Sequence, residues 1–247
     1  MYDSASSMLP ELRGVRERLY EKFDISLRDA ELAVHYVCCF LDAKMKFAGE
    51  LIILPQIADW AWHELILDTV SYRSLCMRKF GYVLPHIKES DSEHLREVFA
   101  LSMAMFRANY GLESGDKPEE WLDAGWDHPS YRLRRPVSRD LTWNESIDQY
   151  LSLVPGIFDR FSEWLPARLV DRFGISESEA AHAVRLYAAH LLALAHGSSA
   201  QSLPPLGSLG RIAWEEHVLW VQRYEADCRL VLGRVIDHKP NQAALIQ

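Results

Sequence analysis

An internal repeat constrains the fold of this chain more than any other feature of its sequence. When residues 61–86 are placed over residues 213–238, nine of the 26 aligned positions are identical and no gap is needed. Chance agreement at average composition would give about one or two identities. The identical pairs are Ala61/Ala213, Trp62/Trp214, Glu64/Glu216, Leu67/Leu219, Tyr72/Tyr224, Cys76/Cys228, Gly81/Gly233, Val83/Val235 and His86/His238. Self-similarity of this kind predicts two tandem copies of one structural unit.

The similarity continues toward the N-terminus at an offset of 150 instead of 152. The matching pairs are Leu19/Leu169, Phe23/Phe173, Ile25/Ile175, Ser26/Ser176, Ala30/Ala180, Ala33/Ala183, Val34/Val184 and Leu41/Leu191. The change in offset falls within residues 42–55 of the first copy and the corresponding residues 193–207 of the second copy. We expect loops there, because loops absorb insertions more readily than helices do.

The first helix predicted in each copy has a recognisable start. Ser26 and Ser176 stand where a side-chain oxygen would cap a helix, and the second serine is followed three residues later by the glutamate of a capping box. Each serine precedes an alanine-rich apolar stretch. We therefore predict helices over about 27–45 and 177–196.

The second helix predicted in the first copy covers 58–80 and ends near Gly81, and its counterpart ends near Gly233. At 100° per residue, one arc of the helix over 58–80 holds apolar and small polar residues, namely Trp62, Leu65, Ile66, Thr69, Tyr72, Cys76 and Phe80. The matching arc holds Trp214, His217, Val218, Val221, Tyr224, Cys228 and Leu232. No stretch alternates with period two for long enough to predict a sheet, so the expected fold class is all-α.

The remaining segments complete the expected organisation. Residues 91–110 have the pattern of an amphipathic helix, and 143–165 is a further helical stretch. Residues 113–142, rich in Gly, Pro, Asp and Trp, are interpreted as an irregular connector. The expected division is a first repeat unit over 1–112 and a second over 143–247, with one compact domain overall as the alternative. We expect the two units to pack with pseudo-two-fold symmetry, because duplicated units tend to reuse one apolar face.

Composition narrows the range of partners. The formal net charge is −8, from 27 basic and 35 acidic residues, which disfavours nucleic acid and anionic membranes as binding partners. The sequence has no recognisable signal peptide and no apolar stretch of the roughly 20 residues that span a bilayer. Its four cysteines form no CxxC pair, and the vicinal Cys38 and Cys39 are poorly placed for a disulfide. We expect a reduced, cytoplasmic protein.

One segment of the first copy resembles a known family. The residues are Asp59-Trp60-Ala61-Trp62-His63, Ile66-Leu67-Asp68-Thr69, Tyr72, Cys76, Phe80-Gly81 and His86. Together they resemble the signature of the glycine-rich-domain-containing-protein-like family, in which D-x-x-W-H-x-H precedes a Tyr, a Cys, a Gly and a final His. The resemblance covers about 54–87, one seventh of the chain, and implies a fold more than an activity.

The sequence departs from that signature in two respects. Leu65 stands where the second histidine of the pair is expected, and the glycine-rich region that gives the family its name is absent. The second copy has the opposite defect, because Glu215 replaces the first histidine while His217 keeps the second. Each copy therefore retains one member of the pair.

These residues suggest a metal site. Asp59 and His63 are four residues apart, so they share one helix face, and His86 could supply a third ligand for a divalent transition metal. The weaker counterpart is His217 with His238 and Glu216. We prefer a structural interpretation for both sets, namely an ordinary Asp59–His63 hydrogen bond and a buried His217 bonded to a backbone carbonyl or a tyrosine.

The other marked residues have structural interpretations as well. Cys76 and Cys228 fit small core residues, because no base that would activate a thiol is evident. Arg132, Arg134 and Arg135 form a small cationic cluster in the connector. We interpret the cluster as a solvated loop face, with anion or partner binding as the alternative.

Three functions are therefore expected, in order of preference. The first is a non-catalytic cytoplasmic interaction or scaffold protein that binds another protein, since no catalytic constellation is present and the duplication has divided the histidine pair. The second is a metal-binding protein or metal-dependent enzyme that uses Asp59, His63 and His86. The third is a small-ligand binder with its cleft between the two copies.

Overall fold

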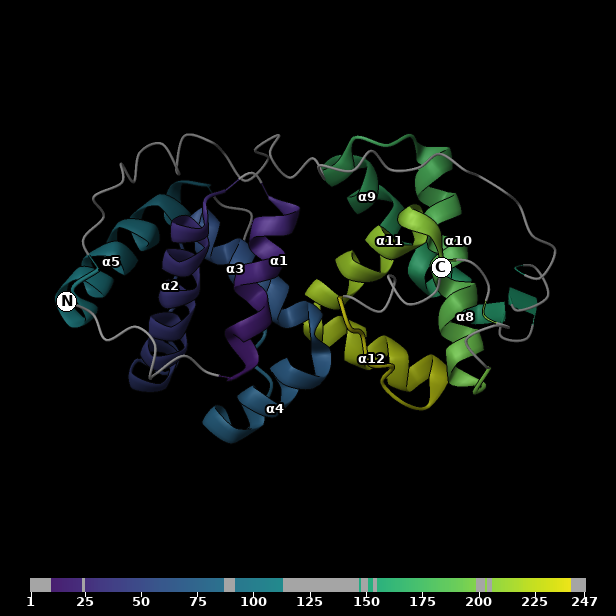
Figure 1. Ribbon diagram of the computed structural model, residues 1–247. Coiled ribbons are helices and arrows are strands. Elements are labelled where there is room, and N and C mark those ends of the chain that lie inside the picture. The colour runs from purple at the N-terminus through teal and green to yellow at the C-terminus, as the bar shows by residue number, and fades with distance from the viewer. Residues whose placement is uncertain are drawn as a thin grey trace. The chain divides into compact units, whose positions relative to one another are not determined.

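All regular elements in the described part of the protein are helices, as a computed structural model shows (Figure 1). The structure describes residues 10–23, 25–86, 92–112, 147, 151–152, 155–198, 203 and 206–240. The predicted all-α class is confirmed over these residues. Within them, no helix combines the length and apolar character needed to cross a membrane.

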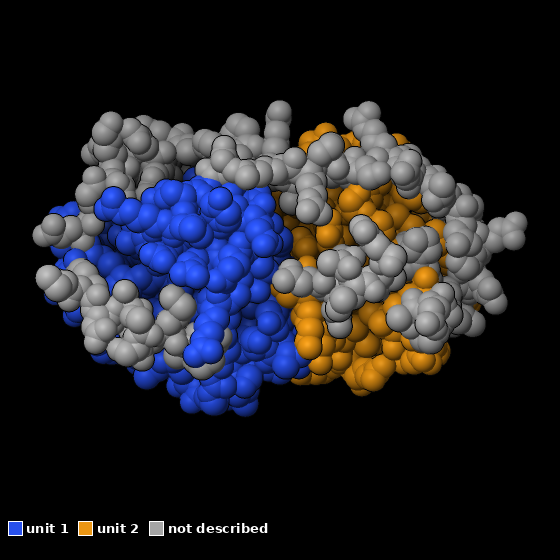
Figure 2. All heavy atoms as spheres, in the orientation of Figure 1, with its two compact units in different colours: residues 1–134 blue, residues 135–247 orange. Residues whose placement is uncertain are grey.

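The chain divides into two compact units, residues 1–134 and 135–247 (Figure 2). The point of division falls inside the predicted connector 113–142, which lies outside the described residues together with Arg132, Arg134 and Arg135. The predicted boundaries at 112 and 143 stay predictions.

The described residues of unit 1 form a short 3-10 helix and five α-helices. The elements are η1 (Pro10–Leu12), α1 (Arg13–Lys22), α2 (Leu27–Lys46), α3 (Gln56–Leu67), α4 (Thr69–Phe80) and α5 (Ser92–Tyr110). Helices α1, α2 and α3 pack against one another, and α4 packs on α3. Ala30, Ala33 and Ala43 are fully buried and place small side chains on the buried face of α2.

The starts and ends of α2 and α5 agree with the sequence. The Ser26 side chain accepts a hydrogen bond from the backbone N–H of Asp29 and caps α2, as predicted. Helix α5 begins at Ser92 and ends at Tyr110, which confirms the helix predicted over 91–110.

The single helix predicted over 58–80 is wrong, because the structure has two helices separated at Asp68. This residue leaves the helical conformation, with φ −85° and ψ 80°, and its carboxylate accepts a hydrogen bond from the backbone N–H of Ser71 to cap α4. The break changes the direction of the chain. Helix α3 is therefore surrounded by its neighbours, and every residue from Trp60 to Leu67 is buried.

Unit 2 contains α8 (Pro155–Ser162), α9 (Leu165–Phe173), α10 (Glu177–Ala195), α11 (Gly207–Leu219) and α12 (Val221–Leu232). Helix α10 packs against α8, α9 and α11. The predicted capping box is present, because the Ser176 side chain accepts from the Glu179 N–H while the Glu179 carboxylate accepts from the Ser176 N–H.

Two further predictions for unit 2 need correction. The helix predicted to end near Gly233 is two helices, α11 and α12, just as the helix predicted over 58–80 is two. They are separated at Trp220, where φ is −88° and ψ is 62°. The helical stretch predicted over 143–165 ends early, since α8 stops at Ser162 and a turn at Glu163 and Trp164 leads into α9. A single helical wheel cannot reveal such breaks, because the apolar period continues across them.

Candidate metal centre

Helix α3 places the first two candidate ligands. Asp59 and His63 lie one turn apart, and Nε2 of His63 is 3.3 Å from Oδ2 of Asp59. The sequence predicted this adjacency. His63 is outside the apolar arc predicted for this helix, yet the structure buries it to 7% exposure, because α3 packs against α1, α2 and α4.

The loop after α4 delivers His86. Gly81 ends α4 with a φ of 76°, a left-handed conformation that favours glycine and turns the chain back. The Tyr72 hydroxyl then donates a 2.7 Å hydrogen bond to the carbonyl of Leu84. Since Tyr72 is buried on α4, this bond fixes the loop two residues before His86.

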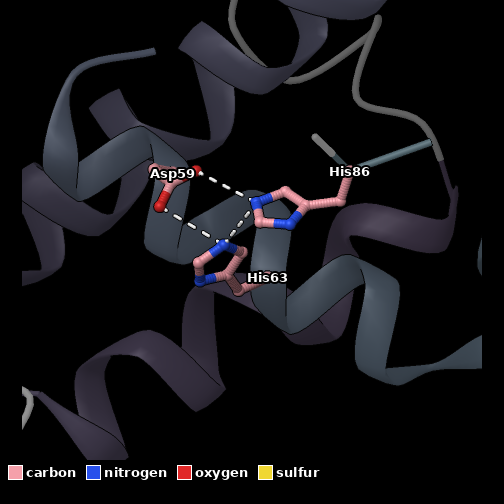
Figure 3. A group of neighbouring side chains, drawn as sticks. All are labelled: Asp59, His63 and His86. Carbon is pink, nitrogen blue, oxygen red and sulfur yellow. Dashed lines mark hydrogen bonds and ion pairs between the residues drawn. The ribbon is translucent and has the colours of Figure 1, made fainter. Parts of the chain in front are cut away.

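The three candidate side chains point toward one another (Figure 3). The two Nε2 atoms of His63 and His86 are 2.9 Å apart, and Nε2 of His86 is 3.8 Å from Oδ1 of Asp59. One ligand atom from each residue lies within 4.8 Å of the others. Among the residues that the structure describes, no other group of three or more His, Cys, Asp and Glu side chains meets this condition.

The surroundings of the group are mainly apolar and aromatic. The edge of Trp62 meets His86 with ring centroids 5.0 Å apart, and Phe40 packs on Trp62 at 4.7 Å. The side chains of His63 and His86 are 9% and 8% exposed, while that of Asp59 is 21% exposed. The group therefore has a shielded imidazole side and a carboxylate side that reaches solvent.

Known proteins give one point of comparison. A model of the UCP032817-like family, an uncharacterised family, matches residues 10–110. The match lies within unit 1, covers less than half of the chain and includes all three residues of the candidate metal centre. No curated protein and no solved structure matches the chain. The resemblance to the glycine-rich-domain-containing-protein-like family stays a prediction.

The weaker ligand set predicted in unit 2 does not form a cluster of three in the described residues. The carboxylate of Glu216 accepts hydrogen bonds from Arg168 and Arg172. His238 packs edge-on against Trp214, with ring centroids 4.7 Å apart. Both arginines come from α9, a contact that the spacing within α11 does not reveal.

His217 instead belongs to a buried polar network. Its Nδ1 lies 2.9 Å from the hydroxyl of Tyr187, which confirms the predicted tyrosine partner. Its Nε2 lies 3.3 Å from Oδ2 of Asp227. All three side chains are completely buried, and Asp227 also accepts a 2.7 Å hydrogen bond from Nε of Arg160. Asp227 was not among the residues predicted from sequence, because it lies outside the predicted apolar arc.

Burial and pairing shift the titration of this network. Burial lowers the pKa of His217, although the neighbouring Asp227 carboxylate favours its charged form. Burial would raise the pKa of Asp227, but the hydrogen bonds from His217 and Arg160 outweigh that effect and lower it. The folded state thus favours a neutral imidazole next to a carboxylate.

We expect acid to weaken the folded state through His217. Below pH ~6.5, the ordinary pKa of histidine, the unfolded chain takes up a proton at His217 that the folded chain does not. The free energy of unfolding therefore falls as the pH drops, by at most about 1.4 kcal/mol per pH unit from this residue. Thermal unfolding of the wild type and of His217→Gln between pH 7.5 and pH 5.5, with EDTA present, measures this contribution. Equal losses in the two proteins would contradict it.

The cysteines agree with a structural interpretation. Cys76 and Cys228 are fully buried, and burial raises the pKa of both thiols, that of Cys228 to about 11. Cys38 and Cys39 form no disulfide with each other. A thiol with a raised pKa is a poor nucleophile and a poor metal ligand near neutral pH.

Proposed function

We propose that unit 1 binds one divalent transition-metal ion through Asp59, His63 and His86. The observation that carries the proposal is the convergence of two imidazole nitrogens and a carboxylate oxygen on one point from separate parts of the chain. Each of these atoms can present a lone pair, and lone pairs held this close repel one another unless a proton or a metal cation lies between them.

The distances suit metal coordination. Ligand atoms that lie about 2.0–2.1 Å from an ion are about 2.8–3.4 Å apart when the angles at the metal are between 90° and 109°. The two Nε2 atoms, 2.9 Å apart, and Nε2 of His63 and Oδ2 of Asp59, 3.3 Å apart, lie in that range. Nε2 of His86 is 3.8 Å from the other carboxylate oxygen, Oδ1, and a small rotation of the Asp59 side chain would shorten this separation. A donor set of two nitrogens and one oxygen suits Zn²⁺ and Fe²⁺ better than Mg²⁺ or Ca²⁺, which prefer oxygen ligands.

A shared proton is the alternative occupant. One protonated imidazole could donate to the other ring and to Asp59, which is the structural hydrogen bond preferred from sequence. The metal proposal is favoured because the Asp59 carboxylate lies within 3.8 Å of both Nε2 atoms, so that three groups meet at one place, whereas a hydrogen bond between the two imidazoles needs only two. The interaction or scaffold role, the ligand cleft and the cytoplasmic location stay predictions.

Zinc titration of the metal-free protein tests the proposal. We expect one equivalent of Zn²⁺ to bind to the full chain, and a loss in affinity of more than about 100-fold in His63→Ala. Asp59→Asn, which keeps the size of the side chain, should weaken binding with little effect on folding. Circular dichroism of each variant separates lost ligands from lost structure.

His238→Ala provides a matched control, because His238 occupies the position in unit 2 that His86 occupies in unit 1 but has no aspartate–histidine pair at the corresponding sites. This variant should still bind one equivalent. Failure of the folded wild type to bind zinc, or equal affinity in the wild type and His63→Ala, would overturn the proposal.

We also propose that the two units descend from one duplicated segment. Breaks at Asp68 and Trp220 divide corresponding helices, and left-handed glycines at Gly81 and Gly233 end the helices that follow. These positions are all related by the sequence offset of 152. Local features that depend on backbone conformation therefore recur at equivalent places.

Side-chain contacts support the same ancestry. Tyr224 donates a 2.6 Å hydrogen bond to the carbonyl of Ile236, as Tyr72 does to Leu84. Glu64 and Glu216 are both buried, and each pairs with two basic residues from a preceding helix, Arg18 and Lys22 in unit 1 and Arg168 and Arg172 in unit 2. Contacts with matching partners are difficult to explain by chance helix packing.

A further inference from the structure

We infer that the metal at Asp59, His63 and His86 keeps at least one exchangeable coordination position, which takes water or a small anion. The inference rests on the proposed function and adds the chemical class of the ligand. It distinguishes a reactive Lewis-acid centre from a closed structural site.

The number of protein ligands is the first argument. Closed structural zinc sites have four protein ligands, whereas sites with an open position have three. The described part of the chain supplies three such groups at this point. The nearest sequence neighbour that could act as a fourth, Glu64, is engaged elsewhere, because its carboxylate accepts hydrogen bonds from Arg18 at 3.1 Å and Lys22 at 2.8 Å.

The charge of the ligand set is the second argument. Two neutral imidazoles and one carboxylate leave a divalent ion with a net charge of about +1. A hydroxide ion or another small anion would neutralise this charge. The shielded rings of His63, His86 and Trp62 lower the local dielectric constant, so the attraction is stronger than it would be in water.

Access is the third argument. The two histidine side chains are nearly buried, but that of Asp59 remains 21% exposed. A fourth ligand can therefore approach along the carboxylate side without displacing Trp62 from His86. The arrangement resembles the two-histidine, one-carboxylate sets that leave neighbouring coordination positions open.

Cobalt substitution tests the inference, because the visible bands of Co²⁺ respond to each ligand. The full-length protein is loaded with one equivalent of Co²⁺ and titrated with sodium azide, while equilibrium dialysis measures the cobalt that remains bound. We expect the bands to shift and saturate with cobalt retained, which indicates azide in the coordination sphere. His63→Ala should show neither the bands nor the shift.

The outcomes separate the two proposals. Cobalt that binds stoichiometrically but whose bands do not change with azide would overturn the open position and leave the metal site intact. Loss of the bands with release of cobalt into the dialysate would also overturn it. Absence of stoichiometric cobalt binding would instead overturn the proposed function, and the inference with it.

Discussion

Arg211→Asp together with Glu215→His is expected to double the metal content of the protein, from one equivalent to two. These positions correspond to Asp59 and His63 at the offset of 152. The third ligand is already present, because His238 packs against Trp214 as His86 packs against Trp62. Both substituted residues are only partly buried, so their replacement should disturb the core little. Zinc titration and elemental analysis of the purified variant measure the gain.

Two controls make this result specific. Arg211→Asp alone should leave the metal content at one equivalent, because an aspartate and a single distant histidine do not form a site. Addition of His238→Ala to the double variant should return two equivalents to one. A folded double variant that still binds only one equivalent would contradict the proposed equivalence of the two units at this place.

Asp227→Leu is expected to lower the free energy of unfolding of unit 2 by about 1–3 kcal/mol. The substitution removes the carboxylate that faces His217 and Arg160, and it leaves buried polar groups without their partner. Unit 1 has Leu75 at the corresponding position, fully buried among apolar residues. The loss of stability should therefore come from His217 and Arg160, which lose their carboxylate partner, rather than from leucine itself. Urea unfolding of the full chain measures it.

A triple variant separates these causes. Tyr187→Phe, His217→Leu and Asp227→Leu together replace the polar network by apolar side chains, while Arg160, whose side chain is 41% exposed, can turn to solvent. We expect the triple variant to recover at least half of the stability that Asp227→Leu loses, since well-packed apolar residues often replace buried ion pairs without cost. A triple variant less stable than the single one would contradict this account.

The helices were largely predictable because their signals are local. Ser26 and Ser176 cap helices through contacts within four residues, and the apolar period defines the stretches that follow. The break at Asp68 has a local signal that the continuous apolar period obscures, because aspartate is a preferred N-cap residue and its carboxylate accepts from Ser71. The break at Trp220 has no such signal, because this residue makes no side-chain cap hydrogen bond.

The candidate metal centre was predictable to the extent that it is local. The spacing of Asp59 and His63 places both on one face of α3, but the position of His86 depends on the bond from Tyr72 to the backbone of Leu84. In unit 2, His217 was expected to bond to a backbone carbonyl or a tyrosine. The identity of that partner, Tyr187, was not accessible because the two residues are 30 positions apart and meet only when α10 and α11 pack.

The separation of His63 and His86 along the chain has a mechanical consequence. The two rings are joined across 23 residues that include all of α4 and the loop after it. An ion held by both would act as a cross-link that closes this segment on itself and restricts the unfolded chain. The backbone amide hydrogens of α4 would then exchange with solvent more slowly in the metal-loaded protein. Metal binding at one site would thus control the local unfolding of an entire helix.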